Sequence, residues 1–344
     1  MPRTSPRLPF RLSGKWSHRL MSLQALYHAT LFVALRRLAR GPRLPNWSWS
    51  FETAIRFLQL QTARAFDMAD PAEGRAYESS LVFHSPAVAQ VEIEPVAAPV
   101  SGHWFRPRAS ASGSSRDLTV LYLHGGGYAY YAKAHANLIA LVTLATGART
   151  FAPDYRLIPE HPFPAQLDDA RAAYAWLLAR GVRPERLVVI GDSAGGNLTL
   201  ALLLALRDAG EPLPALGVGI APWTDVGNSG ASMRDNEAYD WVEKRMADRW
   251  AEWLCRDADP RDPLVSPIHA DLQGLPPIYL QAGDAEILYD MIRAFAEQAR
   301  ARGHDTTLDV WPGMNHDFQA FGDAIPESRE ALARLGEVVA RHVP

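Results

Sequence analysis

Ser193 stands in a pattern that is typical of a nucleophilic serine. Residues 191–195 read Gly-Asp-Ser-Ala-Gly, the G-x-S-x-G arrangement in which small neighbours allow a sharp turn that exposes the hydroxyl. The apolar, β-branched run at 187–190 predicts a buried strand before this turn, and residues 198–207 favour a helix after it. The sequence therefore predicts a strand-to-helix turn, with the free amide groups of the helix aimed at any oxyanion beside the serine.

A row of glycines indicates a second part of the same chemistry. His124 is followed by three glycines at 125–127, directly after another expected strand. Glycines let backbone amides approach a ligand without a Cβ in the way, so Gly126, Gly127 and Ala194 are candidate donors of an oxyanion hole. A phosphate-binding loop is disfavoured because neither G-x-G-x-x-G nor a Walker lysine pattern is present. We expect His124 to fix this loop rather than to act as a base.

A serine nucleophile needs a base, and the base needs an acid that orients it. His316 lies downstream of the serine, in the loop after the last expected strand, and is the predicted base. The strand at 277–281 is followed by three carboxylates at Asp284, Glu286 and Asp290. Asp290 is assigned to the first turn of the next helix, where a negative charge is favourable. Residue type and spacing leave both Asp284 and Glu286 open as the acid.

Alternating strand and helix signals predict the scaffold that must position these groups. Strands are expected at 118–123, 149–152, 187–190, 215–220, 278–281 and 307–310, with weaker ones at 81–84, 91–94 and 102–106. Helices are expected at 135–146, 166–180, 194–208, 244–256, 289–302 and 327–342. This alternation predicts an α/β fold with a mostly parallel sheet covered by helices on both faces, whose reacting groups gather at the carboxyl ends of strands.

The N-terminal part has a different character. Residues 1–19 are rich in Pro, Arg and Ser and are expected to be poorly ordered. From Leu20 to Leu38 apolar residues recur at helical spacing, and a second helix is expected at 51–68. The first helix is interrupted by polar residues, so a membrane span is rejected, and no small-residue cleavage site follows it, which disfavours a secretory signal.

We interpret the chain as two parts: residues 1–75 form a basic arm and helices, and residues 76–344 form a catalytic domain whose alternation of strands and helices is interrupted at about 223–263. A basic amphipathic helix at residues 20–40 is also able to lie on an anionic membrane surface. The role in a lid is the favoured interpretation of that helix.

Composition narrows the class of protein. With 344 residues, 48% of them hydrophobic, one α/β domain with an appendage is expected. The formal net charge is -3, and nine basic residues precede the first acid, Glu52, so the remainder is acidic and no nucleic-acid partner is expected. The single cysteine, Cys255, cannot form an internal disulfide, which fits a reducing, cytoplasmic compartment, with membrane association left open. No Cys or His cluster has the spacing of metal ligands.

Four motifs together resemble a known family. They are His-Gly-Gly-Gly at 124–127, Asp-Tyr-Arg-Leu-Ile-Pro-Glu-His-Pro-Phe-Pro-Ala at 154–165, Gly-Asp-Ser-Ala-Gly-Gly-Asn at 191–197 and Gly-Met-Asn-His-Asp-Phe at 313–318. In this order they resemble the hormone-sensitive-lipase-like esterases of the α/β-hydrolase fold, from about residue 100 to the carboxyl end.

The resemblance implies an α/β-hydrolase sheet and hydrolysis of short- to medium-chain acyl esters without a cofactor. It also implies a lid, built from the N-terminal helices within residues 1–75 and from an insert after the sixth strand, here a lid insert at about 223–263. It implies a bracing, structural role for the segment at 154–157. When Pro277 is matched to the proline that opens the family's seventh strand, Glu286 stands at the position of the acid. The family more often has Asp there, and Asp284 therefore stays open as the partner.

The leading hypothesis is a serine carboxylester hydrolase that acts on a small-molecule ester through Ser193, His316 and Glu286. A binding protein on the same fold, as in the gibberellin receptors that resemble this family, is disfavoured because those receptors lack the base. A third hypothesis is a peripheral membrane esterase acting on lipid or sterol esters, supported only by the basic helix at 20–40. A homo-oligomer is left open.

Overall fold

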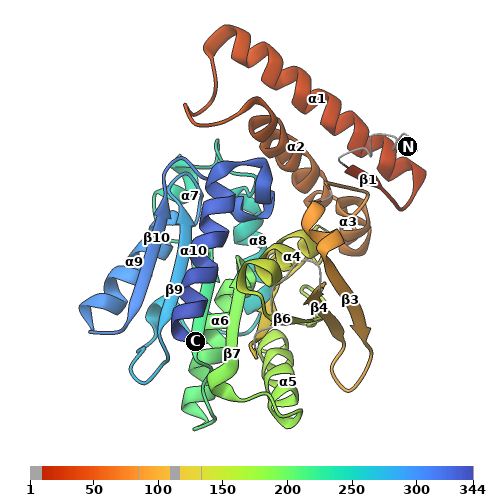
Figure 1. Ribbon diagram of the computed structural model, residues 1–344. Helices are drawn as coiled ribbons and strands as arrows, with labels where there is room; N and C mark the ends of the chain where they lie inside the picture. The colour runs from red at the N-terminus through yellow and green to blue at the C-terminus, as the bar shows by residue number, and fades with distance from the viewer. Residues whose placement is uncertain (1–9, 84, 109–116, 133, 344) are drawn as a thin grey trace.

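An eight-stranded sheet forms the centre of the molecule (Figure 1). The structure, a computed structural model, describes residues 10–83, 85–108, 117–132 and 134–343. The order of strands across the sheet is β10 (Thr306–Trp311), β9 (Ile278–Gly283), β8 (Leu216–Ile220), β7 (Leu187–Asp192), β5 (Thr119–Leu123), β6 (Arg149–Pro153), β4 (Gly102–Pro107) and β3 (Val91–Val96). The first six strands in this order, from β10 through β5 to β6, are parallel to one another. Strand β4 is antiparallel to both of its neighbours, β6 and β3.

Helices cover both faces of this sheet because its strands are apolar on both sides. In β5, Val120 and Tyr122 pack in the cluster that contains α4 (His135–Thr146) and α10 (Pro326–His342). The alternate residues Leu121 and Leu123 pack in the cluster that contains α5 (Ala165–Ala179), α6 (Ala194–Asp208) and α9 (Tyr289–Ala301). Successive side chains of a strand point to opposite faces, so one short apolar strand supplies both clusters. The predicted fold class is confirmed.

The predicted elements of the catalytic part are found close to their expected bounds. The six helices expected after residue 118 are present with ends within one residue of the prediction, and the six strands with ends within two residues. The weaker strands correspond to β2 (Leu81–Phe83), β3 and β4. The described residues also include four 3-10 helices: η1 (Pro86–Gln90), η2 (Pro184–Arg186), η3 (Pro267–His269) and η4 (Phe318–Ala324).

The expectation of poor order for residues 1–19 is wrong for residues 10–19, and residues 1–9 lie outside the described residues. Strand β1 (Phe10–Leu12) pairs antiparallel with β2, with Phe10 opposite Phe83. Phe10 also packs against the apolar cluster that contains Phe57 and Leu81. The strand is too short for a periodic signal and depends on a partner far along the chain, which explains why the sequence pattern did not reveal it.

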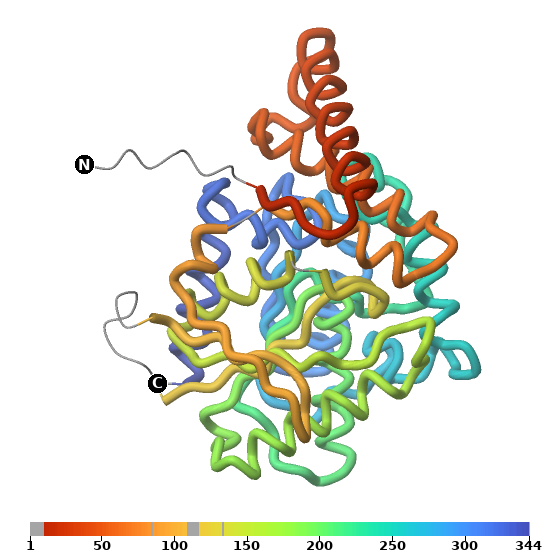
Figure 2. The backbone as a smooth tube through the Cα atoms, turned by 90° about the vertical axis from the view of Figure 1, so that its right-hand side faces the viewer, coloured from red at the N-terminus to blue at the C-terminus, as the bar shows by residue number. Residues whose placement is uncertain are grey.

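Three N-terminal helices stand on one end of the molecule: α1 (Trp16–Arg40), α2 (Trp49–Phe66) and α3 (Pro71–Glu78). Figures 1 and 2 show α1 at the periphery, farthest from the sheet. Small and polar residues form the side of α1 that is buried in the protein: His18, Ser22, Ala25, Ala29 and Val33. The buried carboxylate of Glu52 on α2 pairs with Arg36 and Arg37 and fixes the end of α1, at 3.3 and 2.8 Å.

The insert between β8 and β9 contains two helices, α7 (Ser232–Asp235) and α8 (Lys244–Cys255). Trp223 and Trp250 are buried in the main core cluster, so these two aromatic residues are core of the insert. Within the described ranges, no helix combines the length and the apolar character needed to cross a bilayer.

Candidate active site

Ser193 occupies the sharp turn between β7 and α6 that the sequence predicts. Its backbone has φ 53° and ψ −119°, in the left-handed region that side chains other than glycine rarely adopt. A Cβ on Gly191 would lie 2.1 Å from the carbonyl oxygen of Gly195, and a Cβ on Gly195 would lie 1.9 Å from that of Leu123. Gly191 is therefore required for the turn to close on itself, and Gly195 is required for the turn to pack against the end of β5.

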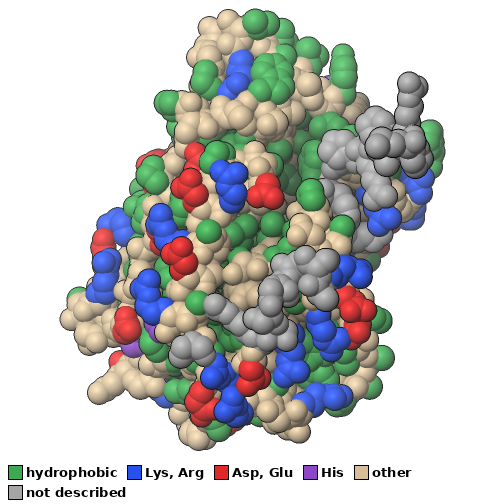
Figure 3. All heavy atoms as spheres, viewed as in Figure 1, with side chains coloured by type: hydrophobic (Ala, Val, Ile, Leu, Met, Phe, Trp, Pro, Cys, Tyr) green, Lys and Arg blue, Asp and Glu red, His purple; other side chains and the backbone are tan. Residues whose placement is uncertain are grey.

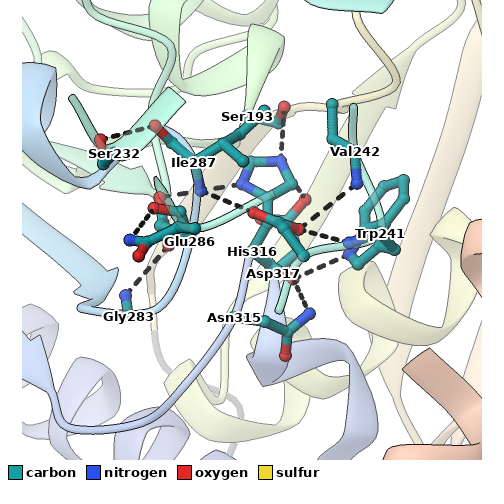
Figure 4. A network of polar contacts seen from close by, with 12 residues as sticks. Ser193, Ser232, Trp241, Val242, Gly283, Glu286, Ile287, Asn315, His316 and Asp317 are labelled. Atoms are coloured by element: carbon teal, nitrogen blue, oxygen red, sulfur yellow. Dashed lines mark hydrogen bonds and ion pairs between the residues drawn. The ribbon is translucent and has the colours of Figure 1, made fainter. Parts of the chain in front are cut away.

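The structure brings His316 to this serine. The imidazole Nε2 lies 2.9 Å from Ser193 Oγ, within hydrogen-bond distance (Figure 4). His316 follows β10, and its ring is buried. The indole Nε1 of Trp241, from the insert, donates to the backbone oxygen of His316 at 2.9 Å. The base is thus held on one side by its own loop and on the other by the insert.

Of the two carboxylates left open by the sequence, the one beside the ring is that of Glu286. Its Oε1 lies 3.8 Å from His316 Nδ1, and its Oε2 accepts a hydrogen bond from the amide of Gly283 at 3.0 Å. Asp284 is exposed and accepts from the amide of Gly313 at 2.6 Å. The distance from Glu286 to the ring exceeds that of a hydrogen bond, and neither of the two facing atoms has a hydrogen-bond partner in the described part of the chain.

Two further carboxylates border the imidazole, and the sequence analysis assigned no role to either. Oδ2 of Asp317 lies 3.3 Å from His316 Nε2, and the backbone of Asp317 is left-handed at φ 51°. The buried carboxylate of Asp240, in the insert, accepts from the amides of Trp241 and Ile287 at 2.7 and 2.8 Å. Asp317 could have been noticed as the direct neighbour of the base in the Gly-Met-Asn-His-Asp-Phe motif, whereas Asp240 has no local sequence signal.

These carboxylates set the protonation of the base. Burial of the ring acts to lower its pKa, but Asp317, Glu286 and Asp240 outweigh burial and raise the pKa of His316 to about 10. Burial raises the pKa of the Asp317 carboxyl well above its usual range, and His316 opposes that rise. Burial likewise raises the pKa of Asp240 to about 6. The ring and Asp317 compete for a proton, and the imidazole keeps its proton to a higher pH than an ordinary histidine.

The glycine loop lies beside the same turn. Gly126 and Gly127 have φ of 99° and 59°, and a Cβ on Gly127 would lie 2.3 Å from the ring of Trp250. The loop is closed by the amides of Ala129 and Tyr130, which donate to the carbonyl oxygen of Gly126. In the described turns and loops, no backbone hydrogen bond takes up the amide hydrogen of Gly126, Gly127 or Ala194.

His124 is fully buried between two tyrosine rings, with ring centroids 3.8 Å from Tyr131 and 4.1 Å from Tyr155. Burial holds the pKa of His124 well below its usual range, so the ring is neutral. The hydroxyl of Tyr155 donates to the backbone oxygen of His124 at 2.6 Å. These contacts support the structural role expected for His124. In the segment at 154–157, Arg156 binds Asp169 through both carboxylate oxygens.

The N-terminal helices and the insert contact the loops that carry the candidate residues. Before α2, Trp47 Nε1 donates to the backbone oxygen of Gly313, in the loop of the base, at 2.6 Å. Gln59 on α2 donates to the backbone oxygen of Asp240 at 2.6 Å. Arg75 on α3 donates to the backbone oxygen of Ala129, in the glycine loop, at 2.7 Å. The outer helices are thus tied to the site by polar contacts.

No group of three or more His, Cys, Asp and Glu side chains within the described ranges is arranged to hold a metal ion.

Comparison with known proteins places the chain in a family. A family model described as alpha/beta hydrolase fold matches residues 120–320. An acetyl-hydrolase of Streptomyces hygroscopicus is 42% identical over 238 residues, which cover 69% of this chain and 78% of the relative. An esterase of Acinetobacter venetianus is 31% identical over 295 residues, covering 85% of this chain and 95% of the relative.

Solved structures agree with these relatives. The crystal structure of an esterase from the bacterial hormone-sensitive lipase family is 34% identical, covers 93% of this chain and 99% of that chain, and superposes with a TM-score of 0.71. The sheet order, the serine turn and the sequence identity all lead to one conclusion: the protein belongs to the hormone-sensitive-lipase-like esterases of the α/β-hydrolase fold.

Proposed function

We propose that this protein is a serine carboxylester hydrolase that cleaves short- to medium-chain acyl esters. The observation that carries the proposal is the 2.9 Å contact between Ser193 Oγ and His316 Nε2, with a buried Glu286 on the opposite side of the ring. Attack by Oγ on the ester carbonyl transfers its proton to Nε2, while Glu286 orients the ring and stabilises the imidazolium.

We assign the amides of Gly126, Gly127 and Ala194 to the oxyanion hole, where they would stabilise the tetrahedral oxyanion. The lack of a backbone acceptor for these amides in the described turns and loops supports this assignment. Collapse of this intermediate releases the alcohol, which takes the proton from the imidazolium, and leaves an acyl group on Ser193. Water then attacks the acyl-enzyme with His316 as base again, and the carboxylic acid leaves. In each step of this reaction the proton is transferred to or from the imidazole of His316, and no cofactor is needed.

We infer that residues 1–75 and the insert at about 223–263 act as a lid on a catalytic domain at 76–344. The contacts of Trp47, Gln59 and Arg75 with the loops of the site support this division. Ser193 is 9% exposed, and the ring of Trp241 lies 5.5 Å from that of His316, so little room is left beside the nucleophile. This enclosure supports a preference for small acyl groups.

The test of the proposed function is a rate profile across p-nitrophenyl esters. We expect kcat/KM to be highest for acetate to octanoate and at least about tenfold lower for palmitate, because a long chain must displace the packed insert from the site. Initial rates at substrate concentrations below micelle formation measure this profile. Absence of turnover for every ester would refute the hydrolase assignment, and a maximum at palmitate would refute the short-chain preference alone.

The carboxylates near the base predict an alkaline pH profile. A general base must be neutral, so activity falls as pH drops through the pKa of His316, and that pKa is raised above its usual value. We expect the acid limb of kcat/KM to have a midpoint above pH 7. In Asp317→Asn the nearest carboxylate is gone, and the midpoint should move downward by about 1 pH unit.

The measurement is kcat/KM for p-nitrophenyl acetate between pH 5 and 10, corrected for spontaneous hydrolysis. Asp323→Asn, an exposed substitution of the same type in η4, is the matched control and should leave the midpoint in place. A midpoint that stays fixed or rises in Asp317→Asn would contradict the role assigned to this carboxylate.

The location that we propose is the cytoplasm, supported by the single cysteine of the chain. We also propose that residues 20–40 contact a partner outside the chain, either a membrane surface or a second copy of the protein. The exposed apolar side chains of α1 support such a contact.

A further inference from the structure

The outer face of α1 carries a continuous apolar stripe. Its residues are Trp16, Leu20, Leu23, Tyr27, Leu31, Leu35 and Leu38. Trp16 is 71% exposed, Tyr27 64% and Leu38 86%, although these residue types are usually buried. Figure 3 shows hydrophobic side chains standing on the surface of this uppermost part of the molecule. A helix normally turns such a stripe toward its own protein.

The buried side of α1 lies opposite the stripe. Ala25 and Ala29 lie in the cluster that also contains Phe57 of α2, and Ser22 bonds the hydroxyl of Ser80 at 2.8 Å. The five buried positions on this side are small, polar or β-branched, and partly buried Leu26 packs beside them, so α1 is held to the protein without using the leucines of the stripe. A contiguous exposed apolar surface of this kind marks an interaction site.

From these observations we infer that the stripe of α1 is a docking surface for an anionic lipid bilayer, on which the helix lies parallel to the surface. This inference extends the proposed function by naming the partner of α1. Three features of the helix support a bilayer over a second copy of the chain: its charge, its aromatic residues and the period of the stripe.

The charge of α1 is entirely basic. The 25 residues of the helix include no Asp or Glu, while Arg19 and Arg40 form no ion pair within the described part of the chain. Cations that flank an apolar face attract anionic headgroups. Two parallel copies of α1 packed through the stripe would bring Arg19 of one copy toward Arg19 of the other. Like charges would then face each other with no acid on either helix.

The spacing of the stripe also fits a flat surface. From Trp16 to Leu38 most steps are of four residues, so the stripe follows the 3.6-residue period of a straight helix rather than the 3.5-residue period of a coiled coil. Trp16 and Tyr27 add amphipathic rings that favour the boundary between headgroups and acyl chains. A straight apolar side with aromatic residues and cations is suited to lying in that boundary.

The test is vesicle co-sedimentation of the full chain with phosphatidylcholine alone and with phosphatidylcholine containing phosphatidylglycerol. We expect binding to the anionic vesicles that weakens as salt is added. The combined substitutions Leu31→Gln, Leu35→Gln and Leu38→Gln should lower the partition coefficient about tenfold or more, because they remove apolar area from the stripe and keep helix propensity. Arg19→Gln with Arg40→Gln should weaken binding to anionic vesicles only.

The matched control replaces two exposed apolar residues far from α1, Ile93→Gln with Val310→Gln, and should bind like the original protein. Turnover of soluble p-nitrophenyl acetate should be unchanged in the leucine variant, which would show that its fold is intact.

A full chain that stays in the supernatant with both vesicle types would overturn the inference, and so would equal binding by the leucine variant. Self-association that the leucine variant abolishes, without vesicle binding, would assign the stripe to a second copy. Vesicle binding without ester turnover would leave the docking surface standing and refute the hydrolase.

Discussion

Replacing Ser193 by alanine is expected to lower kcat/KM for p-nitrophenyl acetate by about 10⁴-fold or more, to the level that binding and the oxyanion amides alone support. The reason is that the hydroxyl is the only group of this residue that takes part in bond formation. The backbone of Ser193 donates to the carbonyl oxygen of Ile220 at 2.8 Å, and its own carbonyl oxygen accepts from Trp223 at 3.0 Å. Alanine keeps both contacts, so the turn and the fold should persist.

Thermal unfolding of the variant should therefore match that of the original protein within a few degrees. An organophosphate such as diethyl p-nitrophenyl phosphate should attach one phosphoryl group to the original chain, located by mass spectrometry in the peptide that contains Ser193, and none to the variant. Ser101→Ala, an exposed substitution before β4, is the control and should retain full activity and labelling. Residual turnover within about tenfold of the original, with a normal fold, would mean that another nucleophile carries the reaction.

The parts of the site that were predictable are those whose signals are local. The strand before Ser193, the small residues around it and the helix after it all lie in one stretch, and each has its own physical signature: β-branched residues, glycines and helix formers. The same is true of His316, which comes shortly after a strand. Parallel strands then bring their carboxyl ends to one edge of the sheet, so local signals were enough to predict that these residues meet.

The choice of acid was not predictable because it depends on contacts outside its own segment. Asp284 and Glu286 both follow β9, and either side chain could have reached the ring. In the structure the amide of Gly313 donates a hydrogen bond to the carboxylate of Asp284. The amide of Gly283 donates to one carboxylate oxygen of Glu286, and the other oxygen lies beside His316. The decision rests on how the loop after β10 folds against the loop after β9, which no pattern within either loop records.

Asp240 was missed, and the outward direction of the apolar side of α1 was not predictable, for related reasons. Asp240 precedes its partner Ile287 by 47 residues, and only the packing of the insert brings them together. Periodicity shows that a helix has an apolar side, but does not show which side meets the protein. For α1 the answer depends on the close fit of Ala25 and Ala29 near α2, and that fit leaves the leucines of the stripe outside.

The acid can be identified by a matched pair of substitutions that each remove one charge and keep shape. Glu286→Gln is expected to lower kcat about 10²- to 10⁴-fold. If the side-chain oxygen keeps its bond with the amide of Gly283, the new NH₂ group faces His316 Nδ1 and donates to it. That contact favours the tautomer with hydrogen on Nε2, which cannot accept the proton of Ser193. Loss of the negative charge also removes the stabilisation of the imidazolium in the transition state.

Asp284→Asn keeps an oxygen for the amide of Gly313 and should change kcat less than about fivefold. Stopped-flow or steady-state rates with p-nitrophenyl acetate across pH measure both variants. The pH profile separates an orienting acid from a structural residue: in Glu286→Gln a carboxylate that raises the pKa of His316 is gone, so the acid limb should move to lower pH while the plateau falls. A structural defect would lower the plateau and leave the limb where it is.

If Asp284→Asn loses as much activity as Glu286→Gln, or alone shifts the acid limb, the charge partner of the His316 ring would be Asp284. The carboxylate of Glu286, 3.8 Å from the ring, would then not be the acid that orients His316.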